Sequence, residues 1–162
     1  MNSPSRLFVA ATFTVAALSA SVAQAQEMKP VITLATARAI ADGCEAKSKT
    51  EGWKMVVAVV DDGANLKYYS RMDGSFLVSV EIARLKAETS ARVPLPSRKW
   101  GEFSTMIKGL DLVPGMISFA GGLPVMTAAG KHIGGVGVSG GSADQDEQCA
   151  QAGLDAAKDL LK

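Results

Sequence analysis

The sequence predicts a mixed α/β (α+β) domain in which helices flank an antiparallel β-sheet. Two observations predict it. Apolar residues recur at spacings of three and four in several long stretches, which is the period of an amphipathic helix. Between these stretches, β-branched and alternating runs come in pairs joined by short turns that contain glycine, which is typical of hairpins. Hairpins pair neighbouring strands antiparallel, and the helices are left to cover the faces of the sheet.

The first 25 residues are typical of a secretory signal peptide. Arg6 supplies a short positive region, residues 7–22 are apolar and uncharged, and Ala23-Gln24-Ala25 has the small-residue pattern of a cleavage site. An uncleaved membrane anchor is disfavoured, because serine and threonine dilute a run that barely reaches spanning length. We therefore expect a periplasmic or secreted protein with one domain over 26–162 and no membrane insertion after cleavage.

The first predicted helix covers about residues 34–51. Thr33 is placed to cap its beginning and Gly52 to end it. Small and apolar residues at helical spacing share one face of it, namely Leu34, Ala37, Ala41, Cys44 and Ser48.

A hairpin is expected next, in the stretch MVVAVVDDGANLKYYSRM. The β-branched run predicts a central strand over Met55–Val60, and the alternating run after it predicts a second strand. The dipeptide Asp62-Gly63 between them is a tight-turn signal.

A second helix is predicted from Ser75 to about Ala91, and Pro94 and Pro96 end it. Phe76, Val80, Ala83 and Ala87 share its expected buried side, whereas Glu81, Arg84 and Glu88 are expected to face water. A third, shorter helix is predicted over 97–108, and residues 109–115 are expected to form a loop.

Two short strands are predicted over 123–127 and 131–138, with a turn at Ala129-Gly130 between them. A last helix is predicted over 143–161, where Ser142 and Gln145 have the spacing of a capping box. The predicted order is α-β-β-α-α-β-β-(β)-α, in which the bracket stands for a further short strand that is left open near 116–119.

The mature chain is close to neutral. Without Arg6 it carries 16 lysines and arginines against 16 aspartates and glutamates, and no basic run stands out. We therefore expect no nucleic-acid partner, because such partners are bound by clustered positive charge.

The two cysteines, Cys44 and Cys149, predict a disulfide, because an even number of cysteines in an exported chain is usually oxidised. Both lie on apolar faces, one in the first and one in the last predicted helix. If these helices cover the same face of the sheet, the two sulfurs meet. No metal site is expected, since there is no Cys-x-x-Cys pair and His132 is the sole histidine.

The stretch GVGVSG (135–140) has the G-x-G-x-x-G spacing of a dinucleotide-binding loop. That motif needs a second parallel strand after its helix, and here the helix runs to the end of the chain. Asp144, Asp146 and Glu147 at the start of this helix suit the helix dipole and would repel a phosphate. We interpret these glycines as positions where a backbone, a packed helix or a flat ligand approaches a strand closely.

An ordered set of motifs resembles the GlcG/HbpS family, which includes the C-terminal domain of PduO-type corrinoid adenosyltransferases. The motifs are VVAVVDDGANLKYYSRMDG, ARLKAETSA, GGLPV and IGGVGVSGGSADQDEQCAQAGL. The resemblance covers nearly all of the mature chain and implies a five-stranded antiparallel sheet flanked by helices, a homo-oligomer, and noncovalent haem binding. In haem-binding members a threonine is a proposed iron contact, and Thr89 is the matching position here.

Eight residues are candidates for binding haem or another ligand. Arg71 and Asp73 follow the second strand, where Arg71 can meet a carboxylate in a bidentate contact, although a solvated turn is the simpler interpretation. Lys86, Thr89 and Arg92 recur at threefold spacing and form one stripe on the second helix. The stripe is either a ligand contact or simply a flank that faces water. Gly121 and Gly122 leave room beside the strands. His132 carries a usual iron ligand, although a lone histidine at the start of a strand is commonly a surface residue.

The leading hypothesis is an exported haem-binding protein that senses, buffers or sequesters haem, held between the second helix and the glycine-bearing strands. One alternative is an enzyme or accessory protein that acts on a small hydroxy or keto acid, with Arg71 and Lys86 as anion anchors. Another is an oligomeric interaction module without a ligand. Because the sequence has no G-x-S-x-G elbow and no partners for a histidine-based triad, enzymatic activity is left open and no catalytic residue is assigned.

Overall fold

The computed structural model describes residues 28–162, and the predicted signal peptide lies outside them. The elements follow the predicted order: α1 (Leu34–Glu51), β1 (Val56–Asp61), β2 (Leu66–Arg71), α2 (Val78–Arg92), α3 (Ser97–Met106), η1 (Leu110–Leu112), β3 (Gly122–Met126), β4 (His132–Ser139), α4 (Ala143–Ala157) and η2 (Lys158–Leu160). The predicted class of an antiparallel sheet flanked by helices is confirmed.

The sheet has four strands in the order β2-β1-β4-β3, and all neighbouring strands are antiparallel. The count of five that the resemblance implied is corrected to four for residues 28–162, because residues 116–119 form no strand. Side chains satisfy the backbone there in place of a neighbouring strand: Thr89 accepts a hydrogen bond from the Ile117 N–H, and Ser97 donates one to the Phe119 carbonyl.

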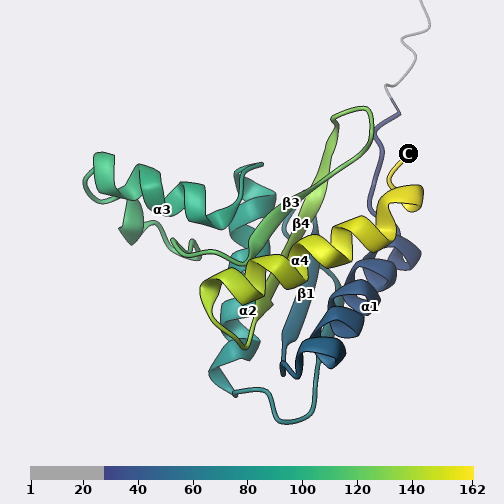
Figure 1. Ribbon diagram of the computed structural model, residues 1–162. Helices are drawn as coiled ribbons and strands as arrows, with labels where there is room; N and C mark the ends of the chain where they lie inside the picture. Colours follow the sequence, from purple (N-terminus) through teal and green to yellow (C-terminus); the bar gives the residue numbers. More distant parts are fainter. Residues whose placement is uncertain (1–27) are drawn as a thin grey trace, which may run out of the picture.

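Helices cover both faces of the sheet. Figure 1 shows α1 and α4 side by side over one face, with α2 behind the strands. The β1 side chains alternate accordingly, because successive residues of a strand point to opposite faces. Val57 and Val59 belong to the core under α1 and α4, whereas Val56 and Val60 pack with the alanines of α2.

The ends of α1 and α4 follow the capping predictions. The Thr33 side chain accepts a hydrogen bond from the Thr36 N–H, and Gly52 ends α1 in the left-handed conformation with a φ of 74°. Ser142 and Gln145 form the predicted capping box of α4.

The start of α2 differs from the prediction. The regular helix begins at Val78, not Ser75, and the Phe76 side chain is 68% exposed although a buried position was expected. Phe76 lies in an irregular turn before the helix, where the Ser79 N–H bonds to the Phe76 carbonyl. Its side chain therefore does not follow the helical face that the spacing assumed.

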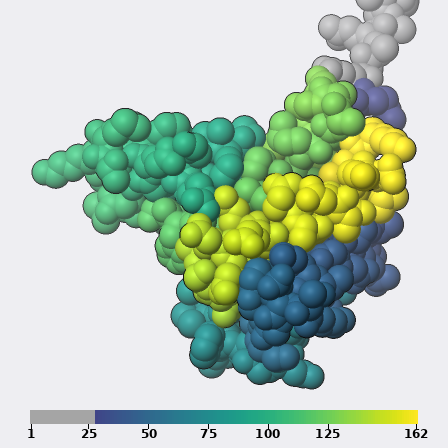
Figure 2. Space-filling view, viewed as in Figure 1, coloured from purple at the N-terminus to yellow at the C-terminus, as the bar shows by residue number. Residues whose placement is uncertain are grey.

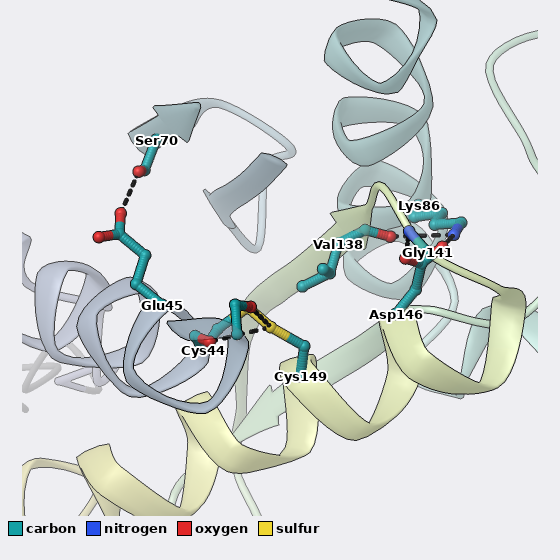
Figure 3. Close-up of a disulfide and its surroundings, with 9 residues drawn as sticks. Cys44, Glu45, Ser70, Lys86, Val138, Gly141, Asp146 and Cys149 are labelled. Atoms are coloured by element: carbon teal, nitrogen blue, oxygen red, sulfur yellow. Dashed lines mark hydrogen bonds and ion pairs between the residues drawn. A yellow bond between two sulfur atoms is a disulfide. The ribbon is translucent and has the colours of Figure 1, made fainter. Parts of the chain in front are cut away.

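The predicted Cys44–Cys149 disulfide is present and joins α1 to α4 (Figure 3). The two helices approach closely because glycines lie at their contact. A Cβ atom on Gly43 would lie 2.5 Å from the Ala156 Cβ, and one on Gly153 would lie 2.3 Å from the Ile40 carbonyl oxygen. Both cysteines are completely buried.

Residues 97–113, here called the arm, comprise α3 and η1 and project from the body of the molecule (Figures 1 and 2). Ser97 is the one buried residue of α3. Four apolar side chains of the arm are exposed by 40% to 78%, namely Met106, Ile107, Leu112 and Val113. Among the helices of residues 28–162, none is both long enough and apolar enough to cross a bilayer.

Candidate functional site

The eight candidate residues do not meet in one slot. Arg71 and Asp73 line a surface pocket at the end of β2. Lys86 and Thr89 are buried inside the domain. His132 lines a different pocket at the beginning of β4.

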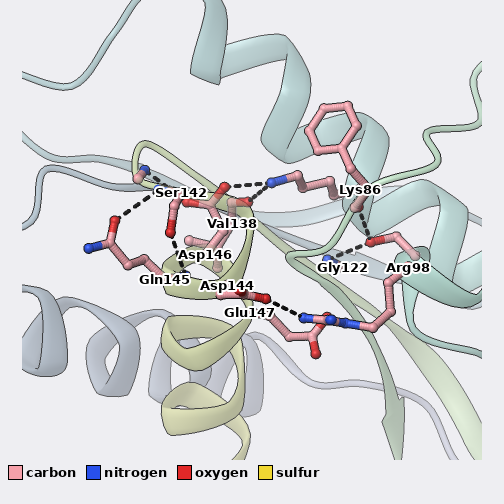
Figure 4. Close-up of polar contacts among 12 residues, drawn as sticks. Lys86, Arg98, Gly122, Val138, Ser142, Asp144, Gln145, Asp146 and Glu147 are labelled. Carbon is pink, nitrogen blue, oxygen red and sulfur yellow. Dashed lines mark hydrogen bonds and ion pairs between the residues drawn. The ribbon is translucent and has the colours of Figure 1, made fainter. Parts of the chain in front are cut away.

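Lys86 is completely buried, which overturns the expectation of a solvated flank or an anion anchor beside Arg71. Its ammonium donates to the Asp146 carboxylate at 2.6 Å and to the Val138 carbonyl at 2.9 Å (Figure 4). The Phe119 ring lies on the ammonium as well, with 4.9 Å between Nζ and the ring centroid. Lys86 thereby joins α2 to the beginning of α4.

Asp146 is the partner that sequence reasoning missed. It was interpreted as a charge that suits the helix dipole at the start of α4, and it is 3% exposed. Its second oxygen accepts the Gly141 N–H at 2.9 Å, so both of its oxygens have partners. One sequence signal existed: Lys86 stands between Ala83 and Ala87, on the apolar side of α2, and a lysine in that place needs a buried anion.

The ionisation of this pair is set mainly by burial. Burial lowers the pKa of Lys86, although the hydrogen bond and charge of Asp146 act in the opposite direction. Burial also raises the pKa of Asp146, against the opposing effect of Lys86. Each ion compensates for the burial of the other. If one of them is removed, the other is left as an unpaired buried charge, which is strongly destabilising.

The glycines beside α2 serve close packing, and the proposed haem slot between α2 and these strands is absent. A Cβ atom on Gly122 would lie 2.3 Å from the Lys86 carbonyl oxygen, and one on Gly137 would lie 2.1 Å from the Ala83 carbonyl oxygen. Gly121 has a φ of 116° and would bring a Cβ atom to 2.7 Å from the Lys86 ammonium. The backbone of α2 occupies the space that a flat ligand would need.

Within residues 28–162, GVGVSG does not belong to the parallel βαβ unit that a dinucleotide-binding loop needs. β4 is paired on both sides with antiparallel strands, and α4 follows it directly. Because Gly135 and Gly137 have no side chains, α2 can lie directly against the strand.

Thr89 and Arg92 also differ from the expectation that they contact a ligand. Thr89 is 1% exposed, and its hydroxyl donates to the Leu85 carbonyl while it accepts the Ile117 N–H. Both uses are internal, so the hydroxyl is not available as an iron contact. Arg92 is partly exposed and pairs with Glu88 at 3.1 Å on its own helix.

Arg98, which the sequence did not single out, connects the arm to α4. It lies 2.9 Å from the Asp144 carboxylate and 2.8 Å from the Glu147 carboxylate (Figure 4). The two carboxylates raise the pKa of Arg98. These residues line a hollow of about 430 Å³ together with Gln148 and Gln151. Two carboxylates face its one cation, so the hollow has no free positive charge for an anionic ligand.

His132 lies in a pocket of about 400 Å³ that Met28, Lys29, Pro30 and Lys131 also line. Its Nε2 atom is buried and has no hydrogen-bond partner within the part of the chain that the structure describes. A buried polar atom without a partner costs free energy unless something else binds it. The pocket thus places an imidazole with a buried, unpartnered Nε2 beside two ammonium groups and the apolar Met28 and Pro30.

The two pockets lie at opposite ends of the sheet. Arg71 pairs with Val56, and Val56 pairs with Ser139 on its other side. His132 stands seven residues before Ser139 on β4. At about 3.3 Å per residue, this separates the two ends by roughly 23 Å along the strand. One ligand of porphyrin size therefore does not contact both Arg71 and His132.

Metal-ligating side chains are not gathered elsewhere in the described residues: no three of His, Cys, Asp and Glu in 28–162 are grouped so that they could hold an ion. Asp144, Asp146 and Glu147 are occupied by Lys86 and Arg98. Through these salt bridges, the three acidic residues connect α4 to α2 and to the arm.

Comparison with known proteins identifies relatives of the whole domain. A family model described as haem degrading protein HbpS-like matches residues 32–155. Protein GlcG of Escherichia coli strain K12 is 33% identical over 115 residues, which is 68% of this chain and 83% of that protein.

Solved structures resemble the fold as well. The crystal structure of HbpS is 33% identical, with a TM-score of 0.75, over 80% of this chain and 92% of that one. The structure of a complex of PduOC with heme is 26% identical, with a TM-score of 0.73, over 78% of this chain and 95% of that one. The resemblance drawn from the ordered motifs is confirmed.

Proposed function

Because the chain belongs to the family described as haem degrading protein HbpS-like, we propose that it binds haem without a covalent bond. We further propose that it is exported and that it senses, buffers or sequesters haem in the periplasm or outside the cell. The heme complex of the similar PduOC supports a haem-related role. The sequence has no Cys-x-x-Cys-His motif, which covalent attachment through such a motif requires.

The observation that carries this proposal is the unpartnered His132 Nε2 in a pocket with two lysines. Imidazole is a usual protein ligand of haem iron, and ammonium groups suit the two propionates. Met28 and Pro30 offer apolar contacts. These residues support a haem site at the beginning of β4, in place of the slot between α2 and the strands.

Each group in this pocket has a definite role. The His132 Nε2 has no hydrogen-bond partner among the described groups, and because it is buried, the ring has to turn toward the pocket before it can ligate an iron. Lys131 is exposed beside it, and Lys29 pairs with Asp62, so Lys131 is the less committed of the two cations. Bound haem would supply the iron and the porphyrin.

The test is a haemin titration of the mature protein followed by its Soret band. Wild-type protein is expected to shift the band and saturate at a fixed stoichiometry. His132→Ala is expected to lose the shift, whereas Lys67→Gln, an exposed change on β2, is expected to retain it. Equal titration curves for wild type and His132→Ala would reject this site.

We also propose that the protein forms a homo-oligomer through the arm. The arm exposes four large apolar side chains, and α3 has one buried residue in ten. A helix of this length is marginal in water without packing. Light scattering after gel filtration is expected to show an oligomer for wild type and a smaller species for Ile107→Asp with Leu112→Asp. An unchanged mass would place the interface elsewhere.

A ligand-free interaction module remains the alternative outcome of these two experiments. Normal assembly together with a negative haemin titration would favour it over the haem-binding proposal.

A further inference from the structure

A second pocket, remote from His132, has the chemistry of a small-molecule site. It has a volume of about 340 Å³, which lies within the size range of small-ligand pockets. The end of α1, the segment before β1 and the end of β2 build it. Its lining residues are Glu45, Lys49, Lys54, Arg71, Met72 and Asp73. We call it the Arg71 pocket.

Two of its cations have no acidic partner. Within residues 28–162, no carboxylate lies within 4.0 Å of the Lys54 ammonium or of the Arg71 guanidinium. Lys49, in contrast, lies 3.7 Å from the Glu45 carboxylate. Lys54 and Arg71 therefore have charge available for an anion.

Neutral groups orient the Arg71 side chain. Its Nε donates to the Ser75 hydroxyl and its Nη2 donates to the Ser75 carbonyl, both at 3.3 Å. Its Nη1 has no protein acceptor in the described residues, so donors remain for a ligand. Ser75 is 6% exposed, which makes it a fixed support. An arginine held in place loses less entropy when it binds a carboxylate.

Lys54 lies beside the same turn. A Cβ atom on Gly74 would lie 3.8 Å from the Lys54 Cγ, so the lysine stem passes the turn that carries Asp73 and Ser75. Gly74 has a φ of 79°, which glycine adopts without strain. The turn thus brings Lys54 and Asp73 to the same pocket.

Asp73 provides the opposite character. Its carboxylate has no hydrogen-bond or ion-pair partner within the part of the chain that is described, whereas Glu45 accepts a hydrogen bond from the Ser70 hydroxyl. A carboxylate accepts hydrogen bonds and repels a second anion. An anion without a hydrogen-bond donor would be attracted by Arg71 and Lys54 but repelled by Asp73. A ligand with a carboxylate and a neighbouring hydroxyl can bind the two cations through its carboxylate and donate a hydrogen bond to Asp73 through its hydroxyl.

We propose that the Arg71 pocket binds a small hydroxycarboxylate. The ligand carboxylate contacts Arg71 and Lys54, and its hydroxyl donates to Asp73. The proposal is independent of haem binding, because this pocket lies at the opposite end of the sheet from His132.

The experiment uses the mature protein and three probes: glycolate, acetate and inorganic phosphate. Binding is followed by calorimetry and by the chemical shift of the Arg71 Nε–H in NMR spectra. Glycolate is expected to saturate and to move that resonance, with acetate at least tenfold weaker because it lacks the hydroxyl. Phosphate binding tighter than glycolate would overturn the assigned class.

Three variants separate the roles of the residues. Arg71→Gln is expected to weaken glycolate at least tenfold, and Asp73→Ala is expected to bring glycolate and acetate to similar affinity. Lys67→Gln, an exposed lysine on the same strand outside the pocket, is expected to bind like wild type. Circular dichroism checks that each variant is folded.

Two results would overturn the proposal. One is the absence of saturable glycolate binding to folded wild type, and the other is an equal loss in Arg71→Gln and Lys67→Gln. His132→Ala is expected to keep glycolate binding, so a failure of the haem proposal leaves this one intact.

Discussion

The Lys86 ammonium lies 2.6 Å from the Asp146 carboxylate, in a place where the lysine is 0% and the aspartate 4% exposed at their side chains. This ion pair joins the middle of α2 to the first turn of α4, and the Phe119 ring lies on it. It links a helix on one face of the sheet to a helix on the other face.

Removing one member of this pair is expected to destabilise the domain strongly. Lys86→Met leaves a buried carboxylate without its cation and should lower the free energy of unfolding by about 3–5 kcal/mol. Urea denaturation measures this change. Lys99→Met, which disrupts an exposed pair with Glu102, should cost less than about 1 kcal/mol.

A double variant tests whether charge is the reason. Lys86→Met with Asp146→Asn removes both charges and is expected to recover a large part of the loss. The losses in unfolding free energy of the two single variants, Lys86→Met and Asp146→Asn, are measured as well. If the double variant loses as much as their sum, the two residues do not act as a unit.

Gly137→Ala is expected to be far more damaging than its size implies. The added Cβ atom would lie 2.1 Å from the Ala83 carbonyl oxygen and 2.3 Å from the Ala87 nitrogen, both backbone atoms of α2. We expect a loss of about 3 kcal/mol in stability, at the upper end for overpacking.

Gly130→Ala is the matched control for this glycine. Nothing lies within 4 Å of its added Cβ atom, and its φ of 75° is the sole source of strain. A cost of about 1 kcal/mol is expected there. Equal costs for the two variants in thermal or urea unfolding would contradict the packing interpretation of the β4 glycines.

Reduction of the disulfide is expected to destabilise the mature protein. Cys44 and Cys149 are 105 residues apart, and closing a loop of this length is worth at most about 4–5 kcal/mol in the chain-entropy model. Urea midpoints of Cys44→Ala with Cys149→Ala and of wild type should differ accordingly. Peptide mapping of exported protein should recover the linked peptides, and free thiols at both positions would refute the bridge.

Asp61 predicts a pH dependence at the hairpin turn. Burial acts to raise its pKa, but hydrogen bonds from the Asn65 and Gly63 N–H groups outweigh burial and lower the pKa below the ordinary value of 3.8. A carboxyl with a lowered pKa in the folded state contributes stability above its unfolded pKa and loses it as pH falls through the folded pKa.

Asp61→Ala should therefore cost about 1 kcal/mol at pH 7, and the difference from wild type should shrink as the pH falls below about 4. Urea denaturation of both proteins at pH 7, 5 and 3 measures it. A difference that is constant with pH would show that the ionised carboxylate is not what supports the turn.

Local signals predicted the backbone of this domain well. Thr33, Gly52, Asp62-Gly63 and Ser142 act within a few residues of themselves, so caps and turns could be located without knowledge of the tertiary structure. The disulfide followed from two helical faces that cover the same side of the sheet.

The candidate site was harder to predict, because its residues depend on contacts across the fold. Lys86 and Asp146 are sixty residues apart, and helical spacing alone does not tell a buried lysine from a solvated one. The Thr89 hydroxyl accepts a hydrogen bond from the Ile117 N–H, which lies in a segment without regular structure. Arg71, Lys86 and His132 were placed in one slot, although β-sheet register separates Arg71 from His132 and burial removes Lys86.

The most direct test of the haem proposal is the absorption spectrum of protein purified from cells supplied with a haem precursor. Wild type is expected to carry a Soret band, and His132→Ala, purified in parallel and equally folded, is expected to lack it. A spectrum without the band in wild type, or the same band in both proteins, would contradict haem binding at His132.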